Sequence, residues 1–317
     1  MIKRRNPWLV IGIVCFLLSL CALGALALGS SALGWGKENE LLLLRLPRVL
    51  AALVAGVALG VGGASQQGLF RNPLADPGLT GVFGGALLGI AVLLSSAETM
   101  VWENPWLVPS AAFTGALLLS LLLVILGGKG STARLLLTGL GLNAFAAAGT
   151  LVLAARNSQA RDVLVSGMAG DWLGTATLPL IAVPIILCLG SSLFLCLQSK
   201  NLDRLSLGED VALTLGCPVQ TVRRQSILFT ALAAAAATCL VGQIAFIGLL
   251  APHLARAILG PRHATVLPLA GLLGGILLLS ADTLGRTLWP QTPLSAAAMT
   301  ALLGAPVFVW IASRQHE

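Results

Sequence analysis

Long apolar runs alternate with short polar segments along almost the whole chain. Because about 20 apolar residues let a helix cross a bilayer, the pattern predicts about ten membrane helices. The short alternating apolar and polar stretches of a membrane barrel are not seen. We therefore predict an all-α polytopic membrane protein with a single transmembrane domain over residues 1–317. The expected helices cover 8–32, 47–68, 79–97, 106–127, 135–154, 174–197, 223–243, 245–259, 265–284 and 294–312.

The run from 45 to 81 carries polar groups at both ends of an apolar helix. It opens with two arginines around Pro47, a residue that suits the first turn of a helix because it lacks an N–H. The helix is expected to end near Asn72, since a residue before proline is disfavoured in the α conformation. A tight turn over 76–78 should follow. The glycines between 60 and 63 should let neighbouring helices approach closely.

Composition supports a membrane protein and predicts its orientation. Of the residues, 57% are hydrophobic and 10% are charged, whereas soluble domains carry roughly 25% charged residues. The net charge of +7 does not indicate nucleic-acid binding, because the basic residues are scattered among short loops. Of the 19 basic residues, 13 fall on the predicted face that holds both termini, so that face is expected to be cytoplasmic. The apolar run from 8 to 33 is longer than the core of a secretory signal, and we expect an uncleaved first helix.

The largest predicted cytoplasmic loop spans about 199–225 and is polar. A helical pattern from Leu207 to Leu215 ends at Gly216, and Pro218 is placed to open a second short helix. Two short helices under the membrane would form a docking surface rather than a pore.

The sequence shows no catalytic or metal-binding pattern. Its six cysteines lie mostly in apolar runs without a C-x-x-C pair, and its three histidines have no ligand-like neighbours. The glycine-rich stretch 127–132 does not match the G-x-x-x-x-G-K-[ST] phosphate loop, so ATP chemistry is expected from another chain. Nearly every Asp and Glu falls in a loop or at a helix end, which argues against the alternative of a proton- or sodium-coupled secondary transporter.

Several motifs, kept in order across nearly the whole chain, resemble the FecCD-type iron-chelate and cobalamin permeases of binding-protein-dependent ABC importers. They are R-x-P-R at 45–48, R-N-P-L-A-x-P from 71, L-G-E at 207–209, F-I-G-L from 246 with P-H at 252–253, A-D at 281–282 with Arg286, and L-G-A-P-V-F at 303–308. Members commonly carry Glu-Leu-Pro-x-Gly before the last helix, whereas this chain has Gln-Thr-Pro-Leu-Ser at 291–295. That departure leaves the details of the outer mouth open.

The resemblance implies a permease subunit in the inner membrane of a bacterium, without an ATPase site or cofactor of its own. Its expected partners are ABC ATPase subunits that bind ATP and Mg, a periplasmic or lipid-anchored substrate-binding protein, and a second permease copy. The expected substrate is an iron(III)-siderophore chelate, with haem and cobalamin left open. Whether the second copy is identical or a close relative also stays open.

The resemblance further implies roles for individual residues. Arginines on the outer face would meet acidic residues of the binding protein, with which arginine forms strong bidentate bonds; the alternative is anchoring to lipid headgroups. Asp282 would pair along the helix with the arginine four residues later. The expected docking residues are Arg45, Arg48 and Arg286, and the expected ATPase-coupling residues are Glu209, Ala212, Gly216 and Arg223. Uncharged polar groups in or near the spans either bond across helices or face a watery path, and the resemblance puts the cytoplasmic gate near Gly84 and Asn143. The expected pathway and gate residues are Gln66, Gln67, Asn72, Gly84 and Asn143.

Overall fold

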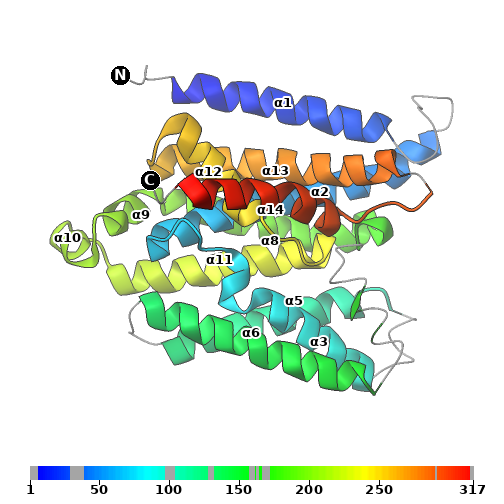
Figure 1. Ribbon diagram of the computed structural model, residues 1–317, viewed down its shortest axis with the longest axis horizontal. Coiled ribbons are helices and arrows are strands. Elements are labelled where there is room, and N and C mark those ends of the chain that lie inside the picture. Colours follow the sequence, from blue (N-terminus) through cyan, green and yellow to red (C-terminus); the bar gives the residue numbers. More distant parts are fainter. Residues whose placement is uncertain are drawn as a thin grey trace.

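In the computed structural model of the chain (Figure 1), residues 6–28, 39–96, 104–127, 132–156, 161, 164–165, 172–289 and 291–314 are described, and these residues contain helices but no strand. The helices are α1 (Pro7–Ala27), α2 (Asn39–Phe70), η1 (Pro77–Thr80), α3 (Val82–Ser96), α5 (Leu107–Gly127), α6 (Thr132–Ala154), η2 (Trp172–Thr175), α8 (Leu178–Leu197), α9 (Ser199–Ser206), α10 (Glu209–Thr214), α11 (Val219–Val241), α12 (Ile247–Leu259), α13 (His263–Leu288) and α14 (Ala296–Arg314). The all-helical prediction is confirmed.

Each of the ten apolar runs has a helix in the structure. Seven helices are long and apolar enough to cross a membrane, namely α1, α2, α5, α6, α8, α11 and α13. The helix α3, the helix α12 and the apolar part of α14 are shorter, at 10–17 residues. The number of ten crossings therefore stays a prediction, while seven candidate spans follow from length and composition.

Two sequence-based helix boundaries are wrong. The second helix begins at Asn39 rather than at 47, so Pro47 lies inside α2. The leucine run before the proline continues the helix, because proline inside a membrane helix removes one N–H bond and neighbouring groups compensate for it. Pro218 does not open a second short helix but is the N-cap of the long helix α11. The two short helices of this loop are α9 and α10, separated by Gly208 with a φ of 115°.

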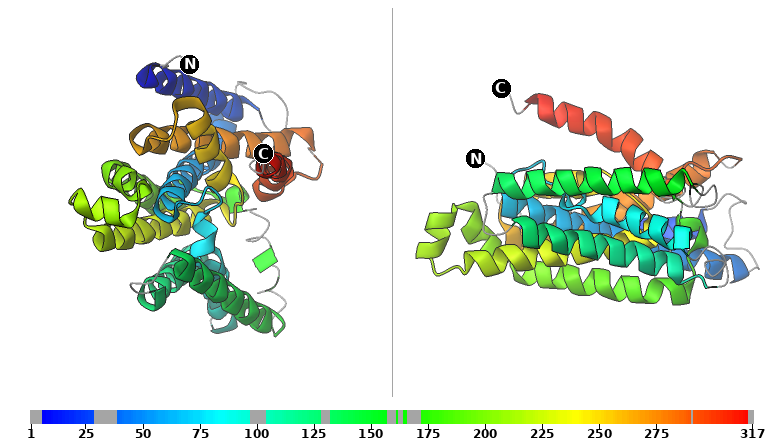
Figure 2. Two further views of the ribbon diagram at one scale, coloured as in Figure 1. Left: turned by 60° about the vertical axis from the view of Figure 1, so that its left-hand side comes forward. Right: turned by 90° about the horizontal axis from the view of Figure 1, so that it is seen from below.

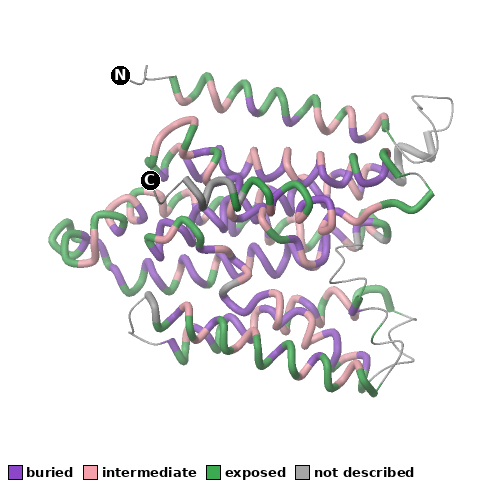
Figure 3. Tube along the Cα trace, in the orientation of Figure 1, coloured by how far each residue is buried: buried purple, intermediate pink, exposed green. Residues whose placement is uncertain are grey.

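Helices α2 and α11 form the interior of the bundle, and the other helices surround them (Figures 2 and 3). In the most apolar window of each, 72% of residues are buried, against 17% in α1. Helices α3, α5 and α6 form a group on one side, while α1 and α14 lie at the periphery (Figures 1 and 2). Both described chain ends lie at the same end of the bundle as α9 and α10 (Figure 1).

Glycine allows α2 to touch its neighbours backbone to backbone. A Cβ atom placed on Gly56 would lie 2.4 Å from the carbonyl oxygen of Gly274 in α13, and one on Gly60 would lie 2.2 Å from that of Ala270. A Cβ atom on Gly63 would lie 2.0 Å from the oxygen of Gly248 in α12. In a bilayer, an apolar side chain gains little by leaving lipid for a neighbouring helix. Helices therefore associate where small residues let their backbones approach closely.

We expect Gly60→Val to separate α2 from α13, because the added methyl groups meet backbone that cannot move aside. Overpacking of this kind costs about 1–3 kcal/mol or more. The variant should show a lower midpoint of thermal unfolding in detergent and less monodisperse protein after size exclusion. Gly190→Val is the matched control, since a Cβ atom at Gly190 on α8 meets no atom within 4 Å. Equal losses in both variants would contradict the packing argument.

Candidate functional site

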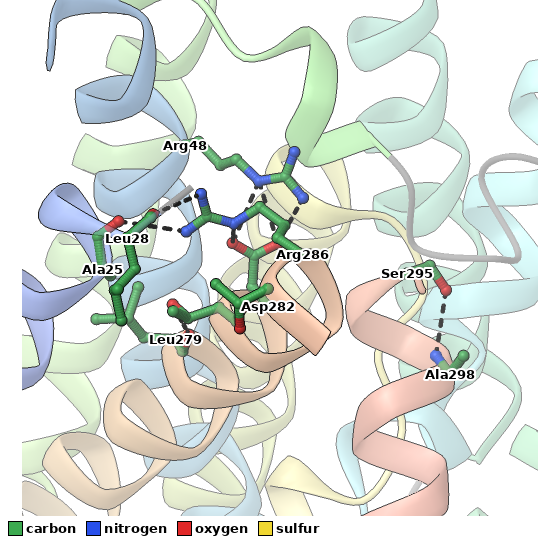
Figure 4. A network of polar contacts seen from close by, with 10 residues as sticks. Ala25, Leu28, Arg48, Leu279, Asp282, Arg286, Ser295 and Ala298 are labelled. Atoms are coloured by element: carbon green, nitrogen blue, oxygen red, sulfur yellow. Dashed lines mark hydrogen bonds and ion pairs between the residues drawn. The ribbon is translucent and has the colours of Figure 1, made fainter. Parts of the chain in front are cut away.

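An arginine cluster, made of Arg45, Arg48, Asp282 and Arg286, joins α2 to the end of α13. Figure 4 shows Arg48, Asp282 and Arg286, and Arg45 lies three residues before Arg48 on α2. Arg48 holds the carboxylate of Asp282 in a fork: its Nε lies 3.1 and 3.2 Å from the two carboxylate oxygens, and its Nη2 lies 2.6 Å from Oδ1. On the other side, Nε of Arg286 lies 3.1 Å from Oδ2 of Asp282 as an ion pair. The pairing of Asp282 with Arg286 along the helix is thereby confirmed.

Two arginines of the cluster also bind the C-terminal end of α1. Nη1 of Arg45 donates to the carbonyl oxygens of Leu26 and Ala27, at 3.1 and 3.2 Å. Arg286 donates to those of Ala25 and Leu28, both at 3.3 Å. The last carbonyls of a helix have no partners within the helix and carry partial negative charge, so guanidinium groups are suitable partners.

The arrangement separates the three predicted docking residues by exposure. The side chain of Arg48 is 23% exposed, whereas Arg45 and Arg286 are buried at 9% and 7%. Anchoring to lipid headgroups, the alternative interpretation of these arginines, fits the two buried ones poorly. With three guanidinium groups and one carboxylate, the cluster keeps a positive surplus that an acidic group can neutralise. Arg48 is the member best exposed to do so.

At the opposite end of the bundle, the coupling segment comprises α9, α10 and the first turns of α11 (Figure 1). Arg223, buried in α11, pairs with Glu209 at the first turn of α10. Ala212 lies on the buried side of α10 and is fully buried, and its carbonyl accepts a hydrogen bond from the N–H of Cys217 at 2.9 Å. Gly216 adopts a φ of 73°, a left-handed conformation that favours glycine and ends α10. The structure thus brings the four predicted coupling residues into one folded unit.

The surface of this unit carries four exposed large apolar side chains among exposed polar ones such as Asp210 and Thr214. The four apolar side chains are between 45% and 64% exposed, although they belong to short helices outside the candidate spans. We name them the apolar ridge: Leu207, Val211, Leu213 and Leu215. An exposed apolar patch on a segment of otherwise polar sequence is typical of a protein interface. The sequence pattern indicated a docking surface here but not which side chains face outward.

The predicted pathway residues fall into separate places. Asn143 of α6 donates to the carbonyl of Gly78 at 2.8 Å and accepts from the N–H of Gly84 at 3.2 Å, so it fastens η1 and α3 to α6. Gln67 donates to the carbonyl of Gly248 at 3.3 Å and accepts from Arg256, which joins α2 to α12. These residues bond across helices.

Asn72 has a local role, because its side chain accepts from the N–H of Leu74 at 2.9 Å and shapes the turn that follows α2.

Gln66 differs from the other pathway residues. It is fully buried, and neither of its amide atoms has a hydrogen-bond partner among the described residues. Ser226 and Thr230, one turn apart on α11, are also fully buried with unpartnered hydroxyl groups. Thr230 packs near Gly62, one turn before Gln66 on α2. Sequence analysis missed the two hydroxyl residues, because single Ser and Thr residues in an apolar helix resemble packing residues.

Asp76 is a third residue that sequence analysis did not single out for function. Its Oδ1 accepts from the N–H of Gly78 at 2.8 Å and caps η1, and its Oδ2 would lie 2.7 Å from a Cβ atom on Gly248. Burial raises the pKa of Asp76 to about 6, and the hydrogen bond from Gly78 opposes this rise. No group of three or more His, Cys, Asp or Glu side chains suited to a metal ion occurs among the described residues.

The raised pKa of Asp76 predicts a pH-dependent stability. The folded protein binds this proton more tightly than the unfolded chain does, so Asp76 lowers the free energy of unfolding as pH rises from about 4 through about 6. Asp76→Asn keeps the acceptor for Gly78 and removes this loss. We expect equal midpoints of thermal unfolding near pH 4 and a higher midpoint for the variant at pH 7–8, in a detergent titration. Exposed Asp210, changed to Asn, is the control. Parallel curves at all pH values would contradict the prediction.

Comparison with known proteins places the chain among transport permeases. The model of the FecCD transport family matches residues 9–314. The hemin transport system permease protein HmuU of Yersinia pestis is 38% identical, over 99% of this chain and 98% of that protein. The vitamin B12 import system permease protein BtuC of Vibrio cholerae is 38% identical, over 99% and 95%. The ferric enterobactin permease protein FepD of Escherichia coli is 39% identical, over 86% and 81%.

A solved structure supports the same fold. An ABC transporter assigned to the metal-chelate type, in an inward-facing conformation, superposes with a TM-score of 0.84 at 27% identity, covering 97% of this chain and 99% of that chain. The chain belongs to the FecCD transport family: it is the membrane-spanning permease subunit of a binding-protein-dependent ABC importer, in which ATPase activity resides in separate subunits.

Proposed function

We propose that this permease imports an iron(III)-siderophore chelate across the inner membrane of a bacterium, with haem and cobalamin as the other candidate substrates. The relatives support this class of large chelates, because their names include hemin, vitamin B12 and ferric enterobactin. Identities of 38% or 39% do not separate the three. The expected assembly is two permease copies, two ATPase subunits and one substrate-binding protein.

The apolar ridge is the observation that carries the proposal. Its exposed leucines lie at the end of the bundle that holds both described chain ends, whereas the arginine cluster lies at the other end (Figure 1). We assign the ridge to the cytoplasm, in agreement with the excess of basic residues predicted there. The ATPase subunit would bury the ridge, and an acidic lobe of the binding protein would approach Arg48. ATP hydrolysis would then shift the population between outward-facing and inward-facing states.

The second permease copy has exposed apolar surface available to it. On α6 and α14, large side chains are between 51% and 71% exposed: Leu137, Leu140, Phe145, Leu151, Val152, Leu302, Leu303 and Val309. A translocation path between two copies would lie along such helices, with Asn143 and Gly84 beside it near the middle of α6. A broad apolar path suits a large chelate that must enter and leave easily.

Replacement of two ridge leucines, Leu213→Ser with Leu215→Ser, should weaken binding of the ATPase by about tenfold or more. Burial of one leucine side chain is worth about 1.5–3 kcal/mol, and each 1.4 kcal/mol is a factor of ten. Affinity is measured by co-purification at graded ATPase concentrations, and ATP hydrolysis is measured in liposomes with ligand-loaded binding protein. Thr214→Ala is the control, on the exposed residue between them. Unchanged ATPase affinity, or uptake that follows an ion gradient without ATP, would reject the proposed function.

Arg48→Gln should lower the affinity for the substrate-binding protein and leave the thermal unfolding midpoint near that of the wild type, because glutamine can still donate to Asp282. Arg45→Leu should instead lower the unfolding midpoint, since leucine has no donor for the α1 carbonyls. Binding-protein affinity and thermal unfolding are measured on the same preparations. Equal effects of the two substitutions on binding-protein affinity would contradict the distinction drawn here.

A further inference from the structure

The coupling segment caps another helix. Asp203, in α9, accepts two hydrogen bonds with one carboxylate oxygen, from the backbone N–H of His263 at 2.8 Å and from the ring Nδ1 of His263 at 2.7 Å. His263 is the first residue of α13, and the N-cap residue Arg262 makes no side-chain cap. Because a carboxylate accepts N–H groups well at a helix N-terminus, Asp203 supplies the cap of α13 from a distant part of the chain.

The ring of His263 is wedged between two elements. It is 4% exposed, with Asp203 of α9 on the Nδ1 side. On the other side its Nε2 has no hydrogen-bond partner among the described residues and faces Gly68 of α2. A Cβ atom placed on Gly68 would lie 2.3 Å from this Nε2, so a residue larger than glycine at position 68 would clash with the imidazole ring. One buried side chain therefore fixes α9, α13 and α2 relative to one another.

The helices α2 and α13 extend this contact to the other end of the bundle. They touch backbone to backbone where Gly56 meets Gly274 and where Gly60 meets Ala270. With 26 residues at 1.5 Å each, α13 is about 39 Å long. At their far ends, α2 and α13 hold all members of the arginine cluster (Figure 4). With no side-chain layer between them to absorb a displacement, the two helices move together.

Besides the bonds of Asp203 and the hydrogen bond that its N-cap residue Gln198 donates to Gln225 of α11 at 2.6 Å, α9 contacts the bundle through apolar side chains. Leu202 and Leu205 are buried against it, at 0% and 2% exposure. Apolar burial holds α9 in place but has no direction, whereas two hydrogen bonds to a single oxygen fix its position along α13. Removal of the carboxylate should thus leave α9 attached but free to shift against α13.

We propose that Asp203 and His263 are a positioning pair, through which docking of the binding protein at the arginine cluster is transmitted along α2 and α13 to the ATPase on the coupling segment. This inference rests on the proposed function. The pair lies outside the apolar ridge, so it acts on the position of the docking surface rather than on its contact with the ATPase. Chains of packed side chains, hydrogen bonds and rigid helices of this kind can carry coupling between distant sites.

The test is binding-protein stimulation of ATP hydrolysis by the full complex in liposomes. In Asp203→Ala and His263→Ala, we expect assembled complex and unstimulated hydrolysis near wild-type levels, with stimulation by ligand-loaded binding protein lowered about fivefold or more, the lower range of allosteric coupling. The double variant should be no worse than either single variant, because both remove the same contact. Asp203→Asn should retain most of the stimulation, since asparagine is also a good N-cap.

Two further variants test the inference without changing Asp203. Gly68→Ala pushes the imidazole from the α2 side, and it should also lower stimulation. His253→Ala, on α12, is the matched histidine control, because no hydrogen bond joins it to the coupling segment in the described structure. Stimulation in this control should equal that of the wild type.

Three outcomes overturn the inference. Unchanged stimulation in Asp203→Ala means that transmission takes another route. An equal loss of complex assembly, unstimulated hydrolysis and stimulation means that the pair only supports folding. If the wild-type complex binds the ATPase but the binding protein does not stimulate hydrolysis, there is no signal to transmit and the inference fails while the proposed ATPase contact stands. If the wild-type chain binds no ATPase, the proposed function itself fails.

Discussion

Direct backbone contact between helices is the constraint on which this structure depends. Lipid chains are as apolar as leucine, so a membrane helix gains little by burying apolar side chains against another helix. The chain gains cohesion where Gly56, Gly60 and Gly63 of α2 approach carbonyl groups of α13 and α12. Because α2 lies at the centre, this contact orders the helices around it. It also makes α2 and α13 one stiff unit with polar groups at each end.

The polar groups at those ends follow from a second rule, that polar atoms away from water need partners. Arg48, Arg286 and Asp282 satisfy one another, and Asn143 satisfies backbone groups of Gly78 and Gly84. These hydrogen bonds and ion pairs have a preferred direction, so they restrict the relative orientation of the helices, which glycine contacts alone do not define. Gln66, Ser226 and Thr230 are among the exceptions in the described interior, which also include Ser65, Ser192 and Nε2 of His263. Gln66 and the two α11 residues belong to central helices that lie side by side. Buried polar groups of this kind are usually satisfied by ordered water.

Sequence patterns predicted the helices better than the contacts between them. Apolar runs of sufficient length predicted the positions of the long helices, because the length of a membrane helix is set by the bilayer and not by tertiary packing. The rule for proline misplaced the start of α2, because a membrane helix can carry a proline in its interior as well as in its first turn. Motif resemblance found the arginines, but not that Arg45 and Arg286 bind α1 carbonyls, because backbone acceptors leave no signature in sequence. His263 had no nearby ligand-like residue and gave no signal; its partner is 60 positions away.

The attachment of α1 has a consequence for the order of assembly in the membrane. This helix buries little of its surface, and its C-terminal carbonyls depend on Arg45 and on Arg286, which lies 258 positions beyond Leu28. During synthesis, α1 enters the bilayer long before α13 has been made. Its end is then held by Arg45 alone, and its final position awaits insertion of α13. Biogenesis therefore leaves α1 loosely attached until nearly all of the bundle is present.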